Sequence, residues 1–501
     1  MSESLFNHVL NPSVDPGRGA IELADGGRVT YGELRAASGR MANAITAAGV
    51  RPGDRVAVQV EKSLEALVLY LGCLRSGAVY LPLNTAYTPA ELGYFIGDAE
   101  PALVVCDPAR LEATAPMAGD ARLLTLDAQG RGSLADAMAG QPDDFATVAC
   151  GTDDLAAILY TSGTTGRSKG AMLTQGNLLT NAQVLRAEWR FTPEDVLLHA
   201  LPLFHTHGLF VACNVALMAG ATTILLPRFD PAAMLERLPR STVMMGVPTF
   251  YTRLLGQDAL TADLCRSVRL FVSGSAPLLA ETHRAWESRT SHRILERYGM
   301  TETGMLTSNP YDGDRIAGTV GLPLPGVEAR IADPQTGALL PDGEIGVVEV
   351  KGPNVFKGYW RMPEKTAAEF RADGFFITGD LGRIDERGYL HIVGRGKDLI
   401  ISGGFNVYPK EVEGEIDALP GVLESAVVGV PHPDFGEGVV AVLVPDHSAP
   451  ITEAAVTAAL TERLARYKQP KRVIVVDELP RNSMGKVQKA LLRERHAGIF
   501  Q

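Results

Sequence analysis

The sequence is poor in cysteine and has no long apolar run. Its 501 residues include five cysteines, at positions 73, 106, 150, 213 and 265, with no Cys-x-x-Cys pair among them. An odd number at such wide spacing argues against a disulfide framework and favours a reducing compartment, so we expect a cytoplasmic protein. No apolar run reaches the roughly 18 residues of a membrane span, and the first residues resemble neither a secretory signal nor a transit peptide. We therefore expect no membrane partner.

Positive charge is also scarce. The 47 Lys and Arg residues are outnumbered by 58 Asp and Glu, a formal net charge of −11. This balance argues against nucleic acid as a partner of the whole molecule. Residues 463–495 reverse it, with ten Lys and Arg against three acidic residues. A solvated charged face and a local site for a phosphate-bearing ligand are both open for that segment.

Strand-like apolar segments alternate with amphipathic, helix-like segments over most of the chain. Residues 30–50 have apolar side chains at helical spacing, and Thr88-Pro89-Ala90-Glu91 combines a capping box with proline at the first helical position. Such alternation predicts mostly parallel sheets covered by helices. Ligands bind beyond the carboxyl ends of parallel strands. The strand candidates that end in polar or Gly/Pro-containing segments are residues 155–159, 196–199, 222–226, 243–245 and 270–272.

The pattern changes twice in the last third of the chain. From about residue 317 short β-runs are separated by turns such as Pro341-Asp342-Gly343-Glu344, which predicts a small antiparallel unit. Residues 394–398 then have the charged, glycine-flanked composition of an exposed hinge. We predict an α/β protein with an N-terminal domain over 1–394, made of helix-covered, mostly parallel sheets and a small β-unit. A small mobile α+β domain over 395–501 should follow.

The segment 160–170 has the composition of a polyphosphate-binding loop. After the apolar run at 155–159, residues 161–170 contain three glycines, five hydroxyl side chains and two cations. Glycine allows backbone N–H groups to approach a ligand, and hydroxyls, N–H groups and Lys169 can donate to anionic oxygens. A flexible surface loop is the alternative, although flexibility alone gives no reason for two cations at its closing end. The segment is not a Walker A loop, because Gly170 follows Lys169.

Five segments, in this order, resemble the adenylate-forming enzymes, the superfamily of acyl-CoA synthetases, adenylation domains and luciferases. They are residues 160–170, Tyr298-Gly299-Met300-Thr301-Glu302, Thr378-Gly379-Asp380, Gly394-Arg395-Gly396-Lys397-Asp398 and Asn482-Ser483-Met484-Gly485-Lys486. The resemblance covers essentially the whole chain. It implies that a carboxylate attacks the α-phosphate of ATP to give an acyl-adenylate and pyrophosphate, and that a thiol then displaces AMP. ATP, Mg²⁺ and coenzyme A are the implied cofactors and co-substrates.

The resemblance also implies a role for each motif residue. Tyr298 would stack on adenine, Thr301 would contact the α-phosphate and Glu302 would hold Mg²⁺. Asp380 would accept the ribose hydroxyls, with Arg395 in support. Lys397 would be the hinge between the domains, and Gly404 would let the thiol arm of coenzyme A pass. The remaining nucleotide-binding positions are Thr161, Ser162, Gly163, Thr164, Thr165, Gly166, Lys169, Ala276, Gly299 and Met300.

Lys486 resembles the lysine that bridges the reacting carboxylate and the α-phosphate oxygens. Its role would be electrostatic, because it stabilises charge that develops during the transfer. Taken alone, a lysine after Gly485 would be a surface charge.

The acyl pocket is expected between segments 204–208, 245–249, 273–277 and 299–304. By resemblance His205 is the gating aromatic position, while His207 and Ser275 face the substrate. Residues 278–286 resemble malonyl-CoA synthetases, and a cation there would suit a second carboxylate because arginine binds carboxylates bidentately. We therefore expect Arg284 and His207 to hold the distal carboxylate of malonate, with methylmalonate tolerated. Taken alone, Arg284 would be an exposed surface charge.

Other functions remain open at this point. A different short-chain or aryl carboxylate–CoA ligase would share every nucleotide motif. A carrier-loading amino-acid adenylating enzyme would need an acidic residue near 204–207, and neither that residue nor a carrier-protein domain after 501 is seen. The pair His205 and His207 could suggest zinc, but no further ligand set is near in sequence. A serine hydrolase would need a second glycine after Ser275. A non-catalytic nucleotide-binding relative would have no use for both Lys486 and Glu302.

Overall fold

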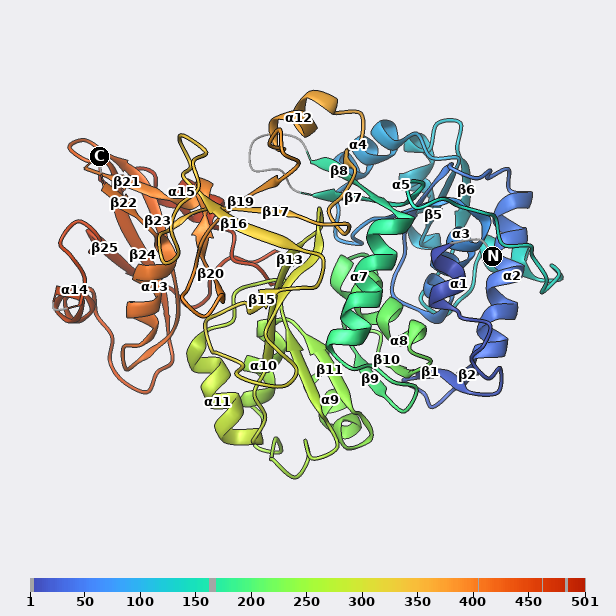
Figure 1. Ribbon diagram of the computed structural model, residues 1–501, viewed down its shortest axis with the longest axis horizontal. Coiled ribbons are helices and arrows are strands. Elements are labelled where there is room, and N and C mark those ends of the chain that lie inside the picture. Colours follow the sequence, from blue (N-terminus) through green and yellow to red (C-terminus); the bar gives the residue numbers. More distant parts are fainter. Residues whose placement is uncertain (1–3, 162–167, 404, 462, 483–484, 501) are drawn as a thin grey trace.

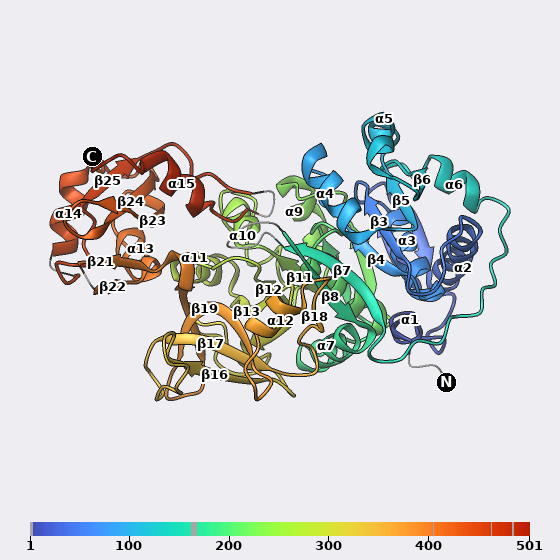
Figure 2. The same cartoon turned by 90° about the horizontal axis from the view of Figure 1, so that it is seen from above.

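The computed structural model describes residues 4–161, 168–403, 405–461, 463–482 and 485–500. The predicted α/β fold is confirmed: helix-covered, largely parallel sheets form the body, and a smaller α+β unit formed by the C-terminal residues lies to one side (Figure 1). Figure 2 shows the same division from above, with the C-terminal residues in orange and red.

One sheet of the body has the strand order β15-β14-β13-β12-β11-β9-β10-β1-β2. The strands from β1 to β13 through β10, β9, β11 and β12 are parallel, while β2, β14 and β15 are antiparallel to their neighbours. Their bounds are β1 Gly19–Leu23, β2 Arg28–Thr30, β9 Val196–His199, β10 Thr222–Leu225, β11 Val243–Gly246, β12 Leu270–Ser273, β13 Leu295–Met300, β14 Gly304–Ser308 and β15 Leu322–Pro323.

A second sheet has the order β18-β8-β7-β4-β3-β5-β6. Its strands β7, β4, β3, β5 and β6 are parallel, and β8 and β18 add antiparallel pairs at one edge. The predicted phosphate loop therefore connects two antiparallel neighbours, β7 and β8. The bounds are β3 Arg55–Gln59, β4 Val79–Pro82, β5 Leu103–Cys106, β6 Arg122–Thr125, β7 Leu155–Thr161, β8 Lys169–Thr174 and β18 Gly358–Tyr359.

Helices cover these sheets, and the local sequence explains where several of them begin. Thr88 caps the helix that starts at Pro89, and its side chain and that of Glu91 form the predicted capping box. The helices of the body are α1 Leu5–Val9, α2 Tyr31–Ala47, α3 Leu64–Ser76, α4 Pro89–Ala99, η1 Pro108–Arg110, α5 Leu111–Thr114, η2 Ala115–Met117, α6 Ser133–Met138, α7 Gln175–Glu188, η3 His207–Cys213, α8 Asn214–Met218, α9 Pro231–Arg237, η4 Leu238–Arg240, α10 Pro248–Leu255, α11 Ala280–Thr290 and α12 Pro363–Ala368.

The predicted antiparallel unit is present as a sheet in the order β16-β17-β19-β20, with bounds β16 Glu328–Ala332, β17 Gly346–Lys351, β19 Phe376–Ile384 and β20 Leu390–Arg395. The short helix η5, Gly396–Asp398, leads from β20 into the C-terminal residues. These form β21 Ile400–Ser402, β22 Phe405–Val407, α13 Pro409–Asp417, β23 Val422–His432, β24 Gly436–Pro445, α14 Glu453–Thr461, β25 Arg472–Val475 and α15 Lys489–His496.

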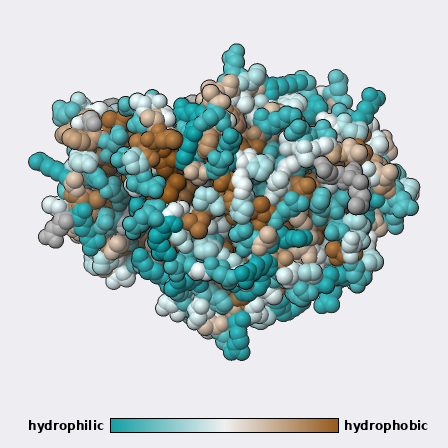
Figure 3. All heavy atoms as spheres, viewed as in Figure 1, coloured by the Kyte–Doolittle hydropathy of each residue, from teal (hydrophilic) through white to brown (hydrophobic). Residues whose placement is uncertain are grey.

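The residues after 399 have hydrophobic clusters of their own. One cluster packs Val412 and Ile416 of α13 against β24, and another packs Leu492 of α15 against β23. A unit with its own core is expected to behave as a domain. The boundary at 394/395 stays a prediction, and it falls at the end of β20. On the face drawn in Figure 3, hydrophobic residues gather towards the region where this unit adjoins the body.

Candidate functional site

The candidate site lies at the carboxyl ends of β12, β13 and β7. Ser275 follows β12, Tyr298 and Met300 end β13, and Thr161 ends β7. The structure thus gathers segments more than 100 residues apart at one edge, as expected for parallel strands. Gly299 permits this because a Cβ atom there would lie 2.0 Å from the carbonyl oxygen of Gly304. Thr301, directly after β13, is half-buried.

Tyr298, Asp380 and Arg395 form a connected polar group. The hydroxyl of Tyr298 donates to Asp380 Oδ2, and Arg395 Nε lies 2.6 Å from Asp380 Oδ1. Asp380 and Arg395 face each other because β19 and β20 pair in that register. Burial raises the pKa of Asp380, while Arg395 is the largest opposing influence. The group brings together three predicted nucleotide-binding residues.

Glu302 is buried in a second polar group that contains two residues missed by sequence reasoning. Its Oε1 lies 3.1 Å from the Tyr359 hydroxyl oxygen and 3.4 Å from Thr161 Oγ1. The Tyr359 hydroxyl donates to Glu369 at 2.6 Å, and Lys169 pairs with Glu369 at 3.0 Å. Burial raises the pKa of Glu302. Tyr359 and Glu369 lie in no recognised motif, so the sequence carried no signal for them.

Lys486 lies within electrostatic range of both polar groups. Its side chain is exposed, yet protein surrounds it closely enough that desolvation lowers its pKa to about 8. Arg395 and Arg297 lower this pKa further, whereas Asp380 and Glu302 oppose them. Gly485, with φ +74°, lies against the body: a Cβ atom there would be 3.3 Å from Thr249 Oγ1. The C-terminal lysine is therefore within the electrostatic reach of the predicted nucleotide site.

The acyl side of the site contains a buried arginine, Arg297, that sequence reasoning did not select. It is 3% exposed, and its Nε and Nη2 have no hydrogen-bond partner among the described residues. Burial lowers its pKa to about 9. Gly274 makes room for it, since a Cβ atom there would lie 2.4 Å from Arg297 Cζ. A possible sequence signal was a Glu-Arg pair inside an otherwise apolar strand.

His207 and Ser275 lie beside this arginine. Ser275 Oγ is 3.3 Å from His207 Nδ1, and His207 Nε2 is buried with no partner among the described residues. Burial lowers the pKa of His207 well below its usual value, with Arg297 as the next cause, so His207 is neutral. Ser275 has φ +71°, a conformation that non-glycine residues rarely adopt and that is found at functional sites.

His205 connects the acyl side to Lys486. It is half-buried, and its Nδ1 accepts the backbone N–H of His207 at 3.2 Å. Desolvation lowers its pKa to about 3, with Lys486 and then Arg297 as further causes. Two cations therefore act on one neutral imidazole, which places Lys486 and Arg297 in one electrostatic neighbourhood.

Arg284 was predicted to hold the distal carboxylate together with His207. It is exposed on α11, where its neighbours His283 and Trp286 are buried, and no described interaction joins it to His207. A solvated guanidinium gains little from a second carboxylate. Arg297, rather than Arg284, has the burial expected of the predicted pocket cation.

The remaining predicted site residues are Ala276 and Lys397, which the structure describes, and six positions outside the described residues. Ala276 is half-buried beside Ser275, and Lys397 is exposed in η5, where Asp398 pairs with Arg493 of α15 at 2.8 Å. Predicted positions outside the described residues are Ser162, Gly163, Thr164, Thr165, Gly166 and Gly404.

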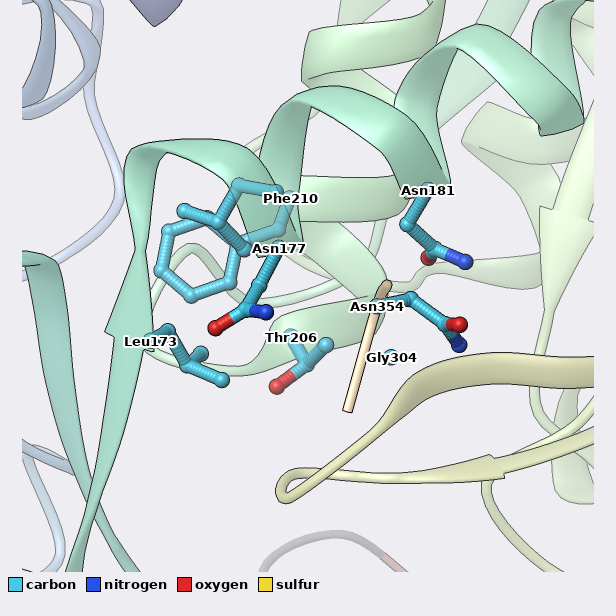
Figure 4. A pocket seen from close by; sticks show the side chains of 8 residues that line it. Leu173, Asn177, Asn181, Thr206, Phe210, Gly304 and Asn354 are labelled. Carbon is cyan, nitrogen blue, oxygen red and sulfur yellow. The ribbon is translucent and has the colours of Figure 1, made fainter. Parts of the chain in front are cut away.

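A cavity of about 10 Å³ lies behind the site, between α7 and the start of β14 (Figure 4). Asn354 Nδ2 donates to the carbonyl oxygens of Thr303 and Met305, and Asn181 binds the backbone of Met305 on the same side. Asparagine side chains thus fix the turn after Glu302. The volume is that of about one water molecule.

A larger cleft, about 260 Å³, opens beside Phe204 and Phe250. Its walls come from the ends of β3 and β4 and from the segments after β9 and β10, and they are mostly apolar. Lys62 and Arg228 also line it. Phe204 precedes His205 and Phe250 follows Thr249, so two cleft-lining residues are sequence neighbours of segments expected to form the acyl pocket.

The described residues contain neither a metal-ligand cluster nor a helix suited to span a membrane. No group of three or more His, Cys, Asp or Glu side chains is arranged to hold a metal ion there. No helix within the described part of the chain is both long and apolar enough to cross a membrane.

Known proteins resemble this chain in sequence and in fold. The profile of the AMP-binding enzyme family matches residues 11–360, and that of the AMP-binding enzyme C-terminal domain matches residues 411–486. A feruloyl-CoA synthase from Amycolatopsis sp is 40% identical over 94% of this chain and 94% of its own length. A malonate–CoA ligase from Arabidopsis thaliana is 37% identical over 89% of this chain and 78% of its own.

Two solved structures of one bacterial protein resemble this structure to different degrees. The ATP-bound crystal structure of MatB from Rhodopseudomonas palustris is 63% identical, covers 100% of both chains and superposes with a TM-score of 0.98. The apo structure of the same protein, with the same identity and coverage, superposes with a TM-score of 0.87. By this measure the present structure is more similar to the ATP-bound structure than to the apo structure.

Proposed function

The chain is a member of the AMP-binding enzyme family, and we propose that it is an ATP-dependent malonate–CoA ligase that also accepts methylmalonate. One carboxylate oxygen of malonate attacks the α-phosphorus of ATP, and the bond to the β-phosphate breaks to release pyrophosphate. The sulfur of CoA then attacks the carbonyl carbon of malonyl-AMP, and AMP leaves with the electrons of the broken C–O bond.

The observation that carries the malonate assignment is the buried Arg297. Its Nε and Nη2 are unpaired among the described residues, as is Nε2 of His207, whose pKa Arg297 helps to lower. A buried cation without a partner is costly, so the arrangement favours a ligand that brings a negative charge. The distal carboxylate of malonate supplies that charge and accepts several hydrogen bonds at once.

The placement of Lys486 favours a short diacid. Lys486 would meet the reacting carboxylate while Arg297 binds the distal one, and the half-buried His205 lies under the influence of both cations. A monocarboxylate of similar size, such as butyrate, would leave Arg297 unpaired in the bound complex. Sites that require a polar partner discriminate strongly against analogues that lack it.

The chain's own residues account for the first half-reaction. Tyr298, Asp380 and Arg395 would bind the nucleoside, and Thr301 would contact the α-phosphate. Lys486 would stabilise the negative charge that develops on the α-phosphate oxygens. Thr161 and Lys169 flank the segment proposed to bind the β- and γ-phosphates.

Glu302 would hold Mg²⁺ together with the phosphates of ATP. It is a buried carboxylate whose pKa is raised by desolvation, so a cation beside it would offset the cost of its charge. One protein carboxylate is sufficient, because Mg²⁺ commonly binds through one or two carboxylates and substrate phosphates. When bound, the ion neutralises phosphate charge.

The cleft beside Phe204 would admit CoA. Its apolar walls suit the pantetheine arm, and the exposed Arg228 offers a cation for phosphate at the rim. The residues from 395 onward would form the mobile domain, with Lys397 at its hinge and Gly404 against the thiol arm. We place the enzyme in the cytoplasm, where its five unpaired cysteines would stay reduced.

An aryl carboxylate–CoA ligase is the second candidate, because a feruloyl-CoA synthase is among the relatives. An aromatic acid would leave a buried cation at the tail of the pocket without a counter-charge. That feature makes it the weaker candidate.

A substrate screen tests the assignment. Malonate, methylmalonate, butyrate and ferulate are compared at equal concentration in ATP–pyrophosphate exchange, and then in AMP release with CoA. Malonate should support both reactions, and its kcat/KM should exceed that of butyrate by about 100-fold or more. Faster turnover of butyrate or ferulate would refute the assignment.

A further inference from the structure

We propose that Lys62 is a positioning residue for malonate recognition, acting through His199 and Gly208 on the segment that carries His207. The inference depends on the proposed function for the identity of the substrate. Lys62 lies on the wall of the cleft beside Phe204, and no motif includes it.

The ammonium group of Lys62 has its three donors fully used. Nζ donates to the carbonyl oxygen of His199 at 3.0 Å, to that of Leu201 at 2.9 Å and to His199 Nδ1 at 2.7 Å. An ammonium has three N–H bonds and no acceptor, so none is left for a ligand in the cleft. Lys62 therefore ties the end of β9 to the segment that follows it.

The hydrogen bonds of both ring nitrogens define the tautomer of His199. The carbonyl oxygen of Gly208 can only accept, so Nε2 must carry the proton, and Nδ1 of the neutral ring accepts from Lys62. Burial lowers the pKa of His199 to about 3, which agrees with a neutral ring. Its Nε2 then donates to the carbonyl oxygen of Gly208 at 2.8 Å.

Gly208 passes this constraint to His207. It is the second residue of η3, a π-helical segment that begins at His207. A Cβ atom at Gly208 would lie 2.0 Å from the carbonyl oxygen of Pro202, so the helix is pressed against the segment that Lys62 holds. The N-cap residue, Thr206, makes no side-chain cap. The start of η3 therefore depends on contacts from outside the helix, and π-helical turns are common at functional sites.

A general contribution to packing is a poorer explanation for Lys62. An apolar side chain could fill the same wall without the cost of desolvating an ammonium, and desolvation here lowers the pKa of Lys62 to about 7. Hydrogen bonds connect Lys62 to His199 and His199 to Gly208, the residue after His207. His207 and Arg297 are the residues at which the distal carboxylate would bind.

The test compares Lys62→Met with Lys351→Met in the full-length enzyme. Met keeps an unbranched side chain that is one heavy atom shorter, and it removes all three donors. Lys351 is a matched control, since its Nζ donates to the carbonyl oxygen of Asp373 at 3.1 Å in the antiparallel unit, away from the site. ATP–pyrophosphate exchange gives KM for ATP, malonate and butyrate without CoA, and AMP release gives KM for CoA.

Lys62→Met should raise KM for malonate about tenfold and reduce the preference for malonate over butyrate by a similar factor. KM for ATP should change less than twofold, and Lys351→Met should match the wild type. His199→Phe, which loses both ring nitrogens, should change the kinetics as Lys62→Met does. The double variant should raise KM for malonate little further, because both residues act through the same hydrogen bonds to Gly208.

The proposal is overturned if Lys62→Met keeps the wild-type preference for malonate, raises every KM equally, or raises KM for CoA alone. If Lys62→Met does not fold, as judged by loss of ATP binding, the His199→Phe result decides by the same criteria. A wild-type enzyme that does not use malonate would instead refute the proposed function, so the two failures are distinguishable.

Discussion

Gly274 and Arg297 are in such close contact that no side chain larger than hydrogen fits between them. A Cβ atom on Gly274 would lie 2.4 Å from Cζ and 2.6 Å from Nε of the arginine. Gly274 follows β12 and Arg297 lies in its neighbour β13, so the contact results from the pairing of two parallel strands. The glycine leaves space for the guanidinium of Arg297, which we propose binds the distal carboxylate.

Gly274→Ala should therefore weaken malonate binding. The added methyl group would displace the guanidinium and raise KM for malonate about tenfold, with KM for ATP nearly unchanged. Steady-state kinetics of pyrophosphate exchange measures both constants. Gly97→Ala is the control, because its Cβ would meet no atom within 4 Å on the exposed side of α4, and its kinetics should be those of the wild type. An unchanged KM for malonate in Gly274→Ala would contradict this account of the contact.

Arg297→Met and Arg284→Met test which arginine binds the distal carboxylate of malonate. The structure favours Arg297, whereas the sequence alone favoured Arg284. The first should lower kcat/KM for malonate roughly 100-fold and leave butyrate nearly unaffected, because it removes the buried charge. The second, on the exposed face of α11, should change neither by more than about twofold. Competition between malonate and butyrate in one reaction gives the ratio directly. The reverse pattern would return the role to Arg284.

Lys486→Ala should abolish adenylate formation and largely spare thioester formation from supplied malonyl-AMP. The lysine acts on charge that develops during phosphoryl transfer, a step that the second half-reaction lacks. Single-turnover assays of each half-reaction measure the two effects. Equal losses in both would exclude this role for Lys486.

The pH dependence of the first half-reaction should reflect the titration of Lys486. Desolvation lowers the pKa of Lys486 to about 8, and the ammonium loses its charge as the pH rises through that value. Hence kcat/KM for adenylate formation, which reports the free enzyme, should fall above about pH 8. In Lys486→Arg the residual activity should fall only at higher pH, because guanidinium stays charged. A descending limb that is unchanged in Lys486→Arg would assign it to another group.

Asp417→Asn should stabilise the protein at neutral and higher pH. Burial raises the pKa of Asp417 in α13 to about 7; Ser425 partly offsets this, and Glu413 and Glu424 add to it. The folded state thus binds a proton that the unfolded state, with a pKa near 3.9, has lost. This carboxyl contributes stability below about pH 4, and that contribution is lost as the pH rises towards 7.

Denaturant unfolding at two pH values measures this effect. At pH 8 the free energy of unfolding of Asp417→Asn should exceed that of the wild type by about 1–3 kcal/mol, and the difference should shrink towards pH 4. Asp434→Asn is the control, because Asp434 is exposed and its substitution should give no such difference. A pH-independent difference in Asp417→Asn would indicate a cause other than the carboxyl charge.

Local sequence was sufficient for most of the elements of this fold. The capping box at Thr88, the strands predicted at 196–199 and 243–245 and the switch to short antiparallel strands after 317 all follow from patterns within about ten residues. The short helix α6 was not among the predicted elements. Its six residues are too few for helical periodicity to be recognised.

The order of the motifs alone was sufficient to recognise the reaction. Motif residues that the structure describes, such as Tyr298, Asp380 and Arg395, are in contact, although 97 positions separate the first from the last. The identity of the pocket cation depended on the tertiary structure. Whether an arginine is buried depends on which other elements pack against the strand or helix face that carries it.

That difference has a simple physical basis. Arg284 and Arg297 are chemically identical and lie 13 positions apart, so composition and local pattern cannot rank them. Pairing of β12 with β13 places Arg297 beneath Gly274 and beside His207, whereas packing of α11 through Trp286 turns Arg284 to solvent. The sequence by itself determined the chemistry of activation, and the packing of distant segments decided where a second negative charge can be bound.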